Sequence, residues 1–280
     1  MLTDLYKFTL YDPTQVTYIT MDLSNFVHEK STGLGVPRIT RFFEQGPTQH
    51  GALDRGFLLQ PRIMAFKLLV RATTPTEFYA RRKTIIDVLR PSVTNVPGQL
   101  RVTLPDATIW KINVFLTDPP VFTRKESLCE EVEFALTAPD PVWTQNVSVA
   151  YLTFAQADIG TSKILTYTGG WITFPYPFSI KGSLTHPIIN NLTSGKKIDL
   201  NYVVPNNTTV LIDLRYGYKT IKQGSTNLLQ YLSSDSDLED FYWLPDPDAT
   251  GGANTIQVLG SSTSTNTTVK LGYTPVKIGL

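Results

Sequence analysis

Residues 100–116 have the sequence LRVTLPDATIWKINVFL, which alternates apolar and polar side chains on both sides of a short turn. Leu100 and Val102 precede the Pro-Asp-Ala turn, and Trp110 and Ile112 follow it at the same spacing. Successive side chains of a strand point to opposite faces, so this period is typical of strands with one buried face. The stretch therefore predicts an antiparallel β hairpin.

The same period extends beyond this hairpin. Residues 132–138 repeat it until a Pro-Asp-Pro segment ends the run. Residues 38–44 and 56–71 also predict strands, with breaks at Gln45-Gly46-Pro47 and Pro61-Arg62, and the second run is apolar enough to be mostly buried. The sequence holds 18 glycines and 19 prolines, and most runs between them are β-branched or aromatic. This pattern is typical of an all-β protein.

One segment departs from the β pattern. Thr74 and Glu77 have the spacing of a capping box, in which each side chain accepts a hydrogen bond from the other residue's backbone N–H. Pro75 suits the first helical position because an N–H there would have no partner. Apolar residues at helical spacing follow until Pro91 stops the run. We therefore expect one amphipathic helix over residues 75–90, packed on a sheet.

The length of 280 residues predicts two domains, because single cores rarely grow beyond roughly 250–300 residues. We place the boundary after the Pro-Asp-Pro segment, which gives domains 1–145 and 146–280. The helical signal vanishes in the second domain, where short strands predict a β sandwich or jelly roll. The expected strands are 148–156, 177–182, 187–191, 197–204, 208–214, 219–223, 254–260 and 267–273.

Composition excludes several function classes. The 25 basic residues almost balance the 24 acidic ones, so no nucleic-acid binding is expected. The single cysteine, Cys129, leaves no intramolecular disulfide to form and no cysteine metal cluster. The start MLTDLYKFTLYDPTQ lacks the pattern of a leader, and no stretch is apolar enough to span a bilayer. We expect a soluble chain that folds in the cytosol, with no membrane insertion.

The residue types used in catalysis are present but poorly arranged. His28, His50 and His186 show no metal-ligand spacing, and the glycine pairs have neither a phosphate-loop lysine nor a nucleophile-elbow serine. Cys129 lies among glutamates, whose charge suppresses the thiolate form. We therefore predict no enzyme activity, no catalytic residues, no cofactor and no metal site.

An acidic stretch is the most ligand-like part of the second domain. Residues 246–251 copy the opening of an EF-hand calcium loop, but Gln257 replaces the bidentate glutamate of position 12. We expect residues 232–252 to form a solvated loop, and cation binding by residues 235–248 stays open. Asp235 and Asp237 offer carboxylates for a glycosidase, although such pairs usually face each other across a cleft.

Aromatic residues provide a second kind of candidate. Two clusters form either core packing or a flat platform for sugar or protein contacts. The clusters are Trp171, Tyr176 and Phe178, and Phe241, Tyr242 and Trp243.

The order of these features resembles the distal tail (Dit) family of siphophage tail proteins. In the first half the resemblance includes Gln45-Gly46, Pro61-Arg62, Leu89-Arg90-Pro91 and the string FALTAPDPVW at 134–143. In the second half it includes IKG at 180–182 and the block PIINNLTSGKKI at 187–198. It continues with Ile212-Asp213, Gly217, GSTN at 224–227 and LSSDS at 232–236. One departure is the separation of Leu244-Pro245 from Gly252-Ala253-Asn254, which adjoin in family members.

The resemblance implies an N-terminal split-barrel-like β barrel with a flanking helix, which assembles head to tail into a hexameric ring. It also implies a C-terminal sandwich that is galectin-like or similar to a carbohydrate module. Such a ring is a virion component, assembled in the host bacterial cytoplasm, and forms the hub of a tail tip or baseplate. Its partners would be the tail tube protein, a tail-associated tip protein and receptor-binding or side-fibre proteins.

Two other hypotheses about the function of the chain remain open. The chain could be a carbohydrate-binding module that contacts a host glycan, or a tip glycosidase that uses Asp235 or Asp237. For the ring, we expect helix 75–90 and strands 38–71 to contribute to the contact between subunits, because they are rich in apolar residues.

Overall fold

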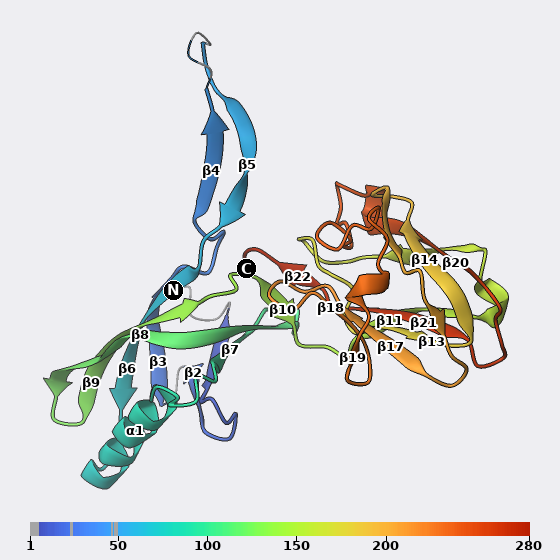
Figure 1. Ribbon diagram of the computed structural model, residues 1–280. Helices are drawn as coiled ribbons and strands as arrows, with labels where there is room; N and C mark the ends of the chain where they lie inside the picture. Colours follow the sequence, from blue (N-terminus) through green and yellow to red (C-terminus); the bar gives the residue numbers. More distant parts are fainter. Residues whose placement is uncertain (1–5, 23–24, 46, 48–49) are drawn as a thin grey trace. The chain divides into compact units, whose positions relative to one another are not determined.

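The computed structural model describes residues 6–22, 25–45, 47 and 50–280. Gly46, one of the expected break residues, and the first five residues of the sequence lie outside this set. The chain divides into two compact units, residues 1–146 with 277–280, and residues 147–276 (Figure 1). Each unit is mainly β, as the sequence predicted.

The first unit is built on a closed barrel of seven strands. Their order is β8-β7-β1-β2-β3-β6-β9, and the pairing of β8 with β9 closes the barrel. Beyond β8 the sheet continues into β10 (Trp143–Gln145) and β22 (Val276–Lys277). The barrel strands are β1 (Lys7–Tyr11), β2 (Tyr18–Asp22), β3 (Phe26–Thr32), β6 (Arg62–Arg71), β7 (Gly98–Thr103), β8 (Ile109–Glu126) and β9 (Cys129–Ala138).

The predicted hairpin is confirmed in register as well as in position. Leu100 pairs with Ile112 and Val102 with Trp110, and all four side chains are buried in the barrel core. Strand β8 is longer than the alternation suggested. The two prolines that follow Asp118 lie where the register between β8 and β9 shifts. Bulges of this kind tolerate residues that have no N–H to donate to the neighbouring strand.

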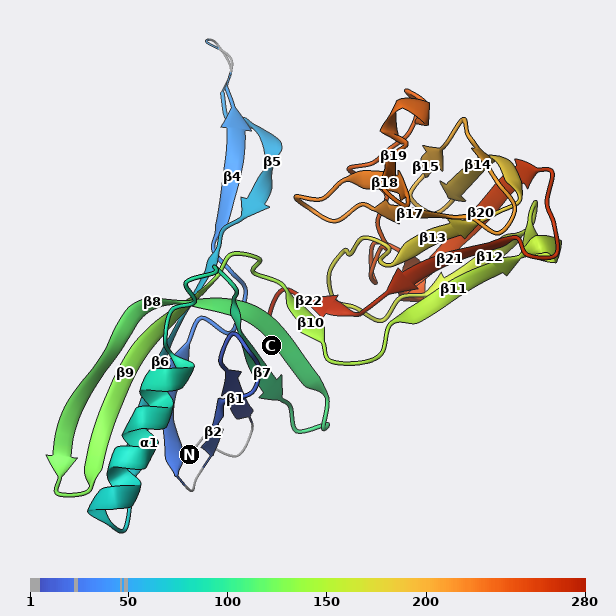
Figure 2. The same cartoon turned by 60° about the horizontal axis from the view of Figure 1, so that its bottom comes forward.

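Helix α1 (Pro75–Val88) packs against β2 and β6 (Figure 2). The Thr74 hydroxyl accepts the Glu77 N–H at 3.3 Å, as the capping box requires. The Glu77 carboxylate, however, accepts from the N–H of Thr73 at 2.9 Å instead of from Thr74. The helix ends two residues before the expected residue 90.

Strands β4 (Ile39–Glu44) and β5 (Leu53–Leu59) form a separate two-stranded sheet, and these two strands are here called the arm (Figure 1). The expected break near Pro61 is confirmed, but the expectation that the run 56–71 is mostly buried is wrong for its first part. Gln60 and Pro61 separate β5 from β6. Among the described strands β5 pairs only with β4, so most of its side chains stay exposed. Burial continues only in β6, where every second side chain enters the barrel core.

The second unit is a β sandwich of two sheets, which confirms the predicted class. One sheet has the order β11-β21-β13-β17-β18-β19 and the other β12-β20-β14-β15, with β16 beside β14. The strand bounds are β11 (Ala150–Ala155), β12 (Ser162–Thr166), β13 (Phe178–Lys181), β14 (Leu184–Asn191), β15 (Lys196–Asp199), β16 (Val203–Val204), β17 (Thr209–Asp213), β18 (Thr220–Gln223), β19 (Thr226–Asn227), β20 (Ala253–Ser261) and β21 (Thr268–Tyr273). Strand β12, which the sequence reading missed, is a short edge strand with a single buried residue, Leu165.

In the described part of the chain, no helix is both long and apolar enough to cross a membrane.

Candidate functional site

The arm carries a group of exposed apolar side chains. Its exposed large side chains are Ile39, Phe42, Phe43, Leu53, Phe57 and Leu58. Ion pairs across the two strands join Arg41 to Asp54 and Arg55 to Glu44. A two-stranded hairpin is marginally stable in water by itself, and clustered apolar surface of this kind marks a protein contact. The arm therefore has the chemistry of an interface element.

The base of the arm is fixed by Arg62, the first residue of β6, which is only 2% exposed. Its Nε and Nη2 donate to the carbonyl oxygen of Pro141 at 3.0 and 2.8 Å, and Nη1 donates to Gly33 at 2.7 Å. Further hydrogen bonds reach the carbonyls of Gly35 and Ile278. Burial lowers the pKa of Arg62 to about 10, so the guanidinium stays charged at neutral pH.

The last residues of the chain complete this base. The Leu280 N–H donates to the carbonyl oxygen of Leu34 at 3.2 Å. The Lys277 ammonium lies 4.4 Å from the centre of the Trp110 ring, and the Arg62 guanidinium lies 5.8 Å from that of Trp143. Four segments that are distant in the sequence therefore meet where the arm leaves the barrel. They are residues 33–35, Arg62, Pro141 and residues 277–280.

The aromatic candidates of the second unit divide into core and surface. Phe178 and Trp243 are buried, Phe178 stacked on Phe241, so their role is packing. Trp171 and Tyr242 are half-buried, and Tyr176 is exposed. The backbones of the two clusters meet where Thr173 pairs with Trp243, so the structure brings both segments together.

A group that the sequence reading missed surrounds Tyr176. The Arg215 guanidinium lies 3.4 Å from the centre of the Tyr176 ring and 4.6 Å from that of Tyr218. Tyr216, at the tip of the same loop, is 90% exposed. We call Tyr176, Arg215, Tyr216 and Tyr218 the tyrosine knuckle. The only sequence signal for it is the string Arg-Tyr-Gly-Tyr, because Tyr176 joins it from a distant segment.

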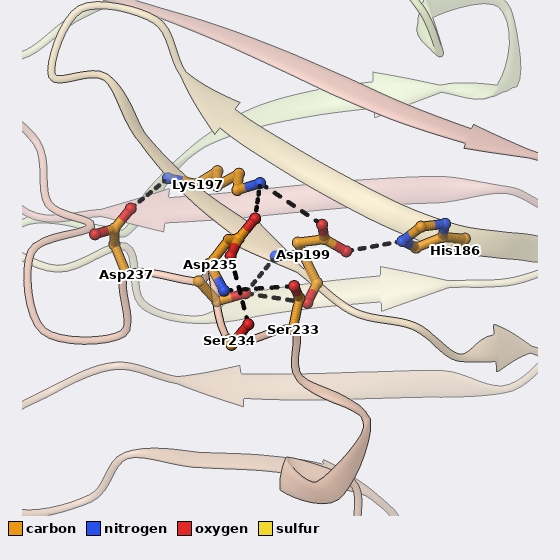
Figure 3. Close-up of polar contacts among 8 residues, drawn as sticks. His186, Lys197, Asp199, Ser233, Ser234, Asp235 and Asp237 are labelled. Atoms are coloured by element: carbon orange, nitrogen blue, oxygen red, sulfur yellow. Dashed lines mark hydrogen bonds and ion pairs between the residues drawn. The ribbon is translucent and has the colours of Figure 1, made fainter.

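The acidic stretch is not the freely solvated loop that was expected. Figure 3 shows residues 233–237 lying along β15. The Asp237 N–H donates to the carbonyl of Lys197 at 2.8 Å, and the Ser233 N–H donates to that of Asp199 at 2.9 Å. The Ser236 hydroxyl also accepts the Asp199 N–H at 2.9 Å. The segment thus covers the open edge of β15, which would otherwise be free to pair with another chain.

Two lysines of β15 form ion pairs with the carboxylates of this segment. Lys196 lies 3.2 Å from both Asp237 and Asp240, and Lys197 lies 3.4 Å from Asp235. His186 Nε2 lies 2.8 Å from Oδ1 of Asp199 (Figure 3). A hydrogen bond from the Lys197 N–H lowers the pKa of Asp237. A carboxyl group held ionised in this way is unsuited to donate a proton to a glycosidic oxygen.

The loop that resembles an EF-hand opening is closed by its own hydrogen bonds. Asp246 Oδ1 accepts the Gly251 N–H at 3.0 Å. Buried Asn254 accepts the Leu244 N–H and donates from Nδ2 to the carbonyls of Leu244 and Gly252, all at 2.9 Å. The Asn254 side chain therefore connects Leu244 to Gly252, across the residues that separate Leu244-Pro245 from Gly252-Ala253-Asn254 in the sequence. Across residues 6–22, 25–45, 47 and 50–280, no three His, Cys, Asp or Glu side chains form a group that could hold a metal ion.

No protein-family profile matches the chain, and no curated protein matches its sequence. Among solved structures, the crystal structure of the SPP1 Dit (gp 19.1) protein matches with a TM-score of 0.63 and 14% identity. The match covers 96% of this chain and 98% of that one, which is described as a paradigm of the hub adsorption apparatus in phages that infect Gram-positive bacteria. The chain has the distal-tail fold.

The resemblance seen in the sequence is therefore confirmed at the level of the fold. Two structures of the phage p2 baseplate in its activated conformation, with Sr and with Ca, also match this chain. They share 11% identity over 96% of this chain and 98% of theirs, with TM-scores of 0.44 and 0.43.

Proposed function

We propose that the chain is a structural, non-enzymatic component of a phage tail tip. In this role it forms a hexameric ring that joins the tail tube to tip and receptor-binding proteins. The observation that carries the proposal is the distal-tail fold, which extends over both units instead of one. The chain would act in the virion, after assembly in the bacterial cytoplasm. We further propose that the first unit forms the ring and the second carries outward partner contacts.

The arm supports ring formation on physical grounds. Apolar side chains remain exposed on both of its strands, and neither strand pairs with the barrel sheet. A head-to-tail contact, in which the arm of one copy covers a different surface of the next, closes into a ring when the rotation between copies is a simple fraction of a turn. Strand β6 and helix α1 follow the arm in the sequence, and they remain part of the proposed interface between subunits.

Negative-stain electron microscopy and mass photometry of the purified chain test the proposal. We expect a ring with a central channel and a mass of about six chains. The variant Phe43→Ser/Leu58→Ser should shift the assembly to monomers, because it removes two exposed apolar contacts of the arm. Leu192→Ser/Leu211→Ser, which changes two similarly exposed leucines of the second unit, is the matched control. Monomers alone at micromolar concentration of the unmodified protein would count against the ring.

The state of the acidic segment supports the non-enzymatic part of the proposal. Asp235 and Asp237, the candidate glycosidase carboxylates, are paired with Lys197 and Lys196 and lie along an edge strand. We expect no glycosidase turnover, and therefore no difference between the unmodified protein and Asp235→Asn/Asp237→Asn on cell-wall polysaccharide. Release of reducing ends that disappears in this variant would overturn the proposal.

A further inference from the structure

The loop between β17 and β18 places a large aromatic side chain where folding does not require one. The Tyr218 N–H donates to the carbonyl of Arg215 at 3.1 Å, and Gly217 has φ +82°, so residues 215–218 form a tight turn. Such turns usually carry Gly, Asn or Asp. Here Tyr216 occupies the tip with 90% of its surface exposed, whereas Leu214, two residues earlier, is buried. Tyr216 therefore contributes little to the core of this unit.

The surrounding side chains are held in place before any ligand arrives. Arg215 donates to both carboxylate oxygens of Asp213, from Nε at 3.0 Å and from Nη2 at 2.7 Å. Its guanidinium also lies against the rings of Tyr176 and Tyr218. Hydrogen bonding to Asp213 raises the pKa of Arg215 further, which keeps this ion pair intact. A surface fixed in this way loses little conformational entropy on binding.

The chemistry of the knuckle selects among ligand classes. The charge of Arg215, the one charged residue of the knuckle, is balanced by Asp213. The knuckle's own residues therefore add no unpaired positive charge that would attract an anionic polymer. Its accessible surface consists of tyrosine rings and hydroxyl groups, which combine an apolar face with a polar tip. A pyranose ring has the complementary arrangement of C–H groups on its faces and hydroxyl groups at its edge.

We infer that the tyrosine knuckle is a stacking site for a neutral saccharide. Tyr216 and Tyr218 would contact the faces of sugar rings, while the Arg215–Asp213 pair would offer a donor and an acceptor to neighbouring hydroxyl groups. The site lies within the second unit and goes beyond the proposed ring function. It also differs from the aromatic platform expected from the sequence, since of the six residues named there only Tyr176 belongs to it.

The test uses the full chain on an array of neutral hexose and N-acetylhexosamine oligosaccharides. We expect retention on a subset of glycans, and a loss of roughly tenfold or more in apparent affinity for both Tyr216→Ala and Tyr218→Ala. Tyr151→Ala is the matched control, because Tyr151 is a 49% exposed tyrosine on β11 of the same unit. Arg215→Lys should also weaken binding, since a lysine keeps the charge but loses the planar stacking and the paired hydrogen bonds.

Two outcomes would overturn the inference. One is the absence of retention on every neutral glycan by the unmodified protein, and the other is equal retention by the unmodified protein and Tyr216→Ala. If Tyr216→Ala abolishes binding to another tail protein while no glycan is retained, the knuckle is a protein-docking site and the inference is wrong. Mass photometry of the same variants keeps this test separate from the ring, because the knuckle variants should assemble like the unmodified protein.

Discussion

Arg62 donates two hydrogen bonds to the carbonyl oxygen of Pro141, a residue 79 positions away in the sequence. The buried guanidinium has only carbonyl oxygens as hydrogen-bond acceptors among the described residues. It therefore satisfies several backbone groups at once and connects the closing segment of the barrel to the base of the arm.

Replacing Arg62 should damage the first unit strongly. Arg62→Met leaves the carbonyls of Pro141 and Gly33 without this donor, and we expect the free energy of unfolding to fall by about 2–4 kcal/mol. Urea unfolding followed by tryptophan fluorescence measures the change. Arg55→Met, on the arm, is the control and should cost less than about 1 kcal/mol, because its ion pair with Glu44 is exposed. Similar losses in both variants would contradict the structural role of Arg62.

Arg82 and Glu130 attach helix α1 to the barrel. Arg82 Nη1 donates to Glu130 Oε1 at 3.0 Å, and its guanidinium lies 4.4 Å from the centre of the Phe122 ring. Glu130 is buried, so Arg82→Met leaves a carboxylate without its cation and should cost roughly 2–4 kcal/mol. The double variant Arg82→Met/Glu130→Met should recover much of that loss in urea unfolding. Additive losses would show that the two residues are not coupled.

His28 gives the first unit a predicted dependence on pH. Burial lowers the pKa of His28, whose ring lies 4.8 Å from that of Phe8, so the folded state disfavours the proton that the unfolded chain binds near pH 6.5. This penalty is absent at pH 8 and grows as the pH falls below 6.5. Urea unfolding at pH 8 and pH 5 should therefore show a smaller loss for His28→Leu than for the unmodified protein. Parallel losses would rule out His28 as the cause.

Asn254 should determine whether the loop 245–251 keeps its shape. Its buried amide makes three hydrogen bonds to the backbone of Leu244 and Gly252, so Asn254→Ala should reduce stability by about 2–3 kcal/mol. Hydrogen exchange should also increase at Leu244. Asn190→Ala, which removes only a weak 3.5 Å contact to Gln257, is the control. Unchanged exchange in the Asn254 variant would contradict this assignment.

Local patterns in the sequence predicted those structural features that depend on residues close together in the chain, such as hairpins and helix caps. The alternation around Trp110 and the cap at Thr74 are set by a few adjacent residues, and both appear in the structure. The barrel strands β1 and β2 were missed, although Phe8 and Leu10, like Ile19 and Met21, alternate in the same way over five residues each. Such short runs are difficult to separate from loops without their partners.

Burial and surface clusters were harder to predict because they depend on distant segments. The arm is rich in apolar residues, but among the described strands β4 and β5 pair only with each other, and most of their side chains are exposed. The acidic run was expected to be solvated, yet Lys196 and Lys197 of β15 hold it against a sheet edge. Tyr176 was named as a candidate, but its partner Arg215 lies 39 residues later, beyond the reach of any local pattern.

The return of residues 277–280 to the first unit has an evolutionary consequence. Asn146 donates its N–H to the carbonyl of Ile109, and the Lys277 ammonium lies over the ring of the next residue, Trp110. The chain therefore leaves the first unit and re-enters it at adjacent points of one strand, which makes the second unit an insertion into a hairpin-like site. Insertions between close ends are well tolerated. A barrel with this architecture can exchange the inserted unit by recombination while the residues of the barrel core stay unchanged.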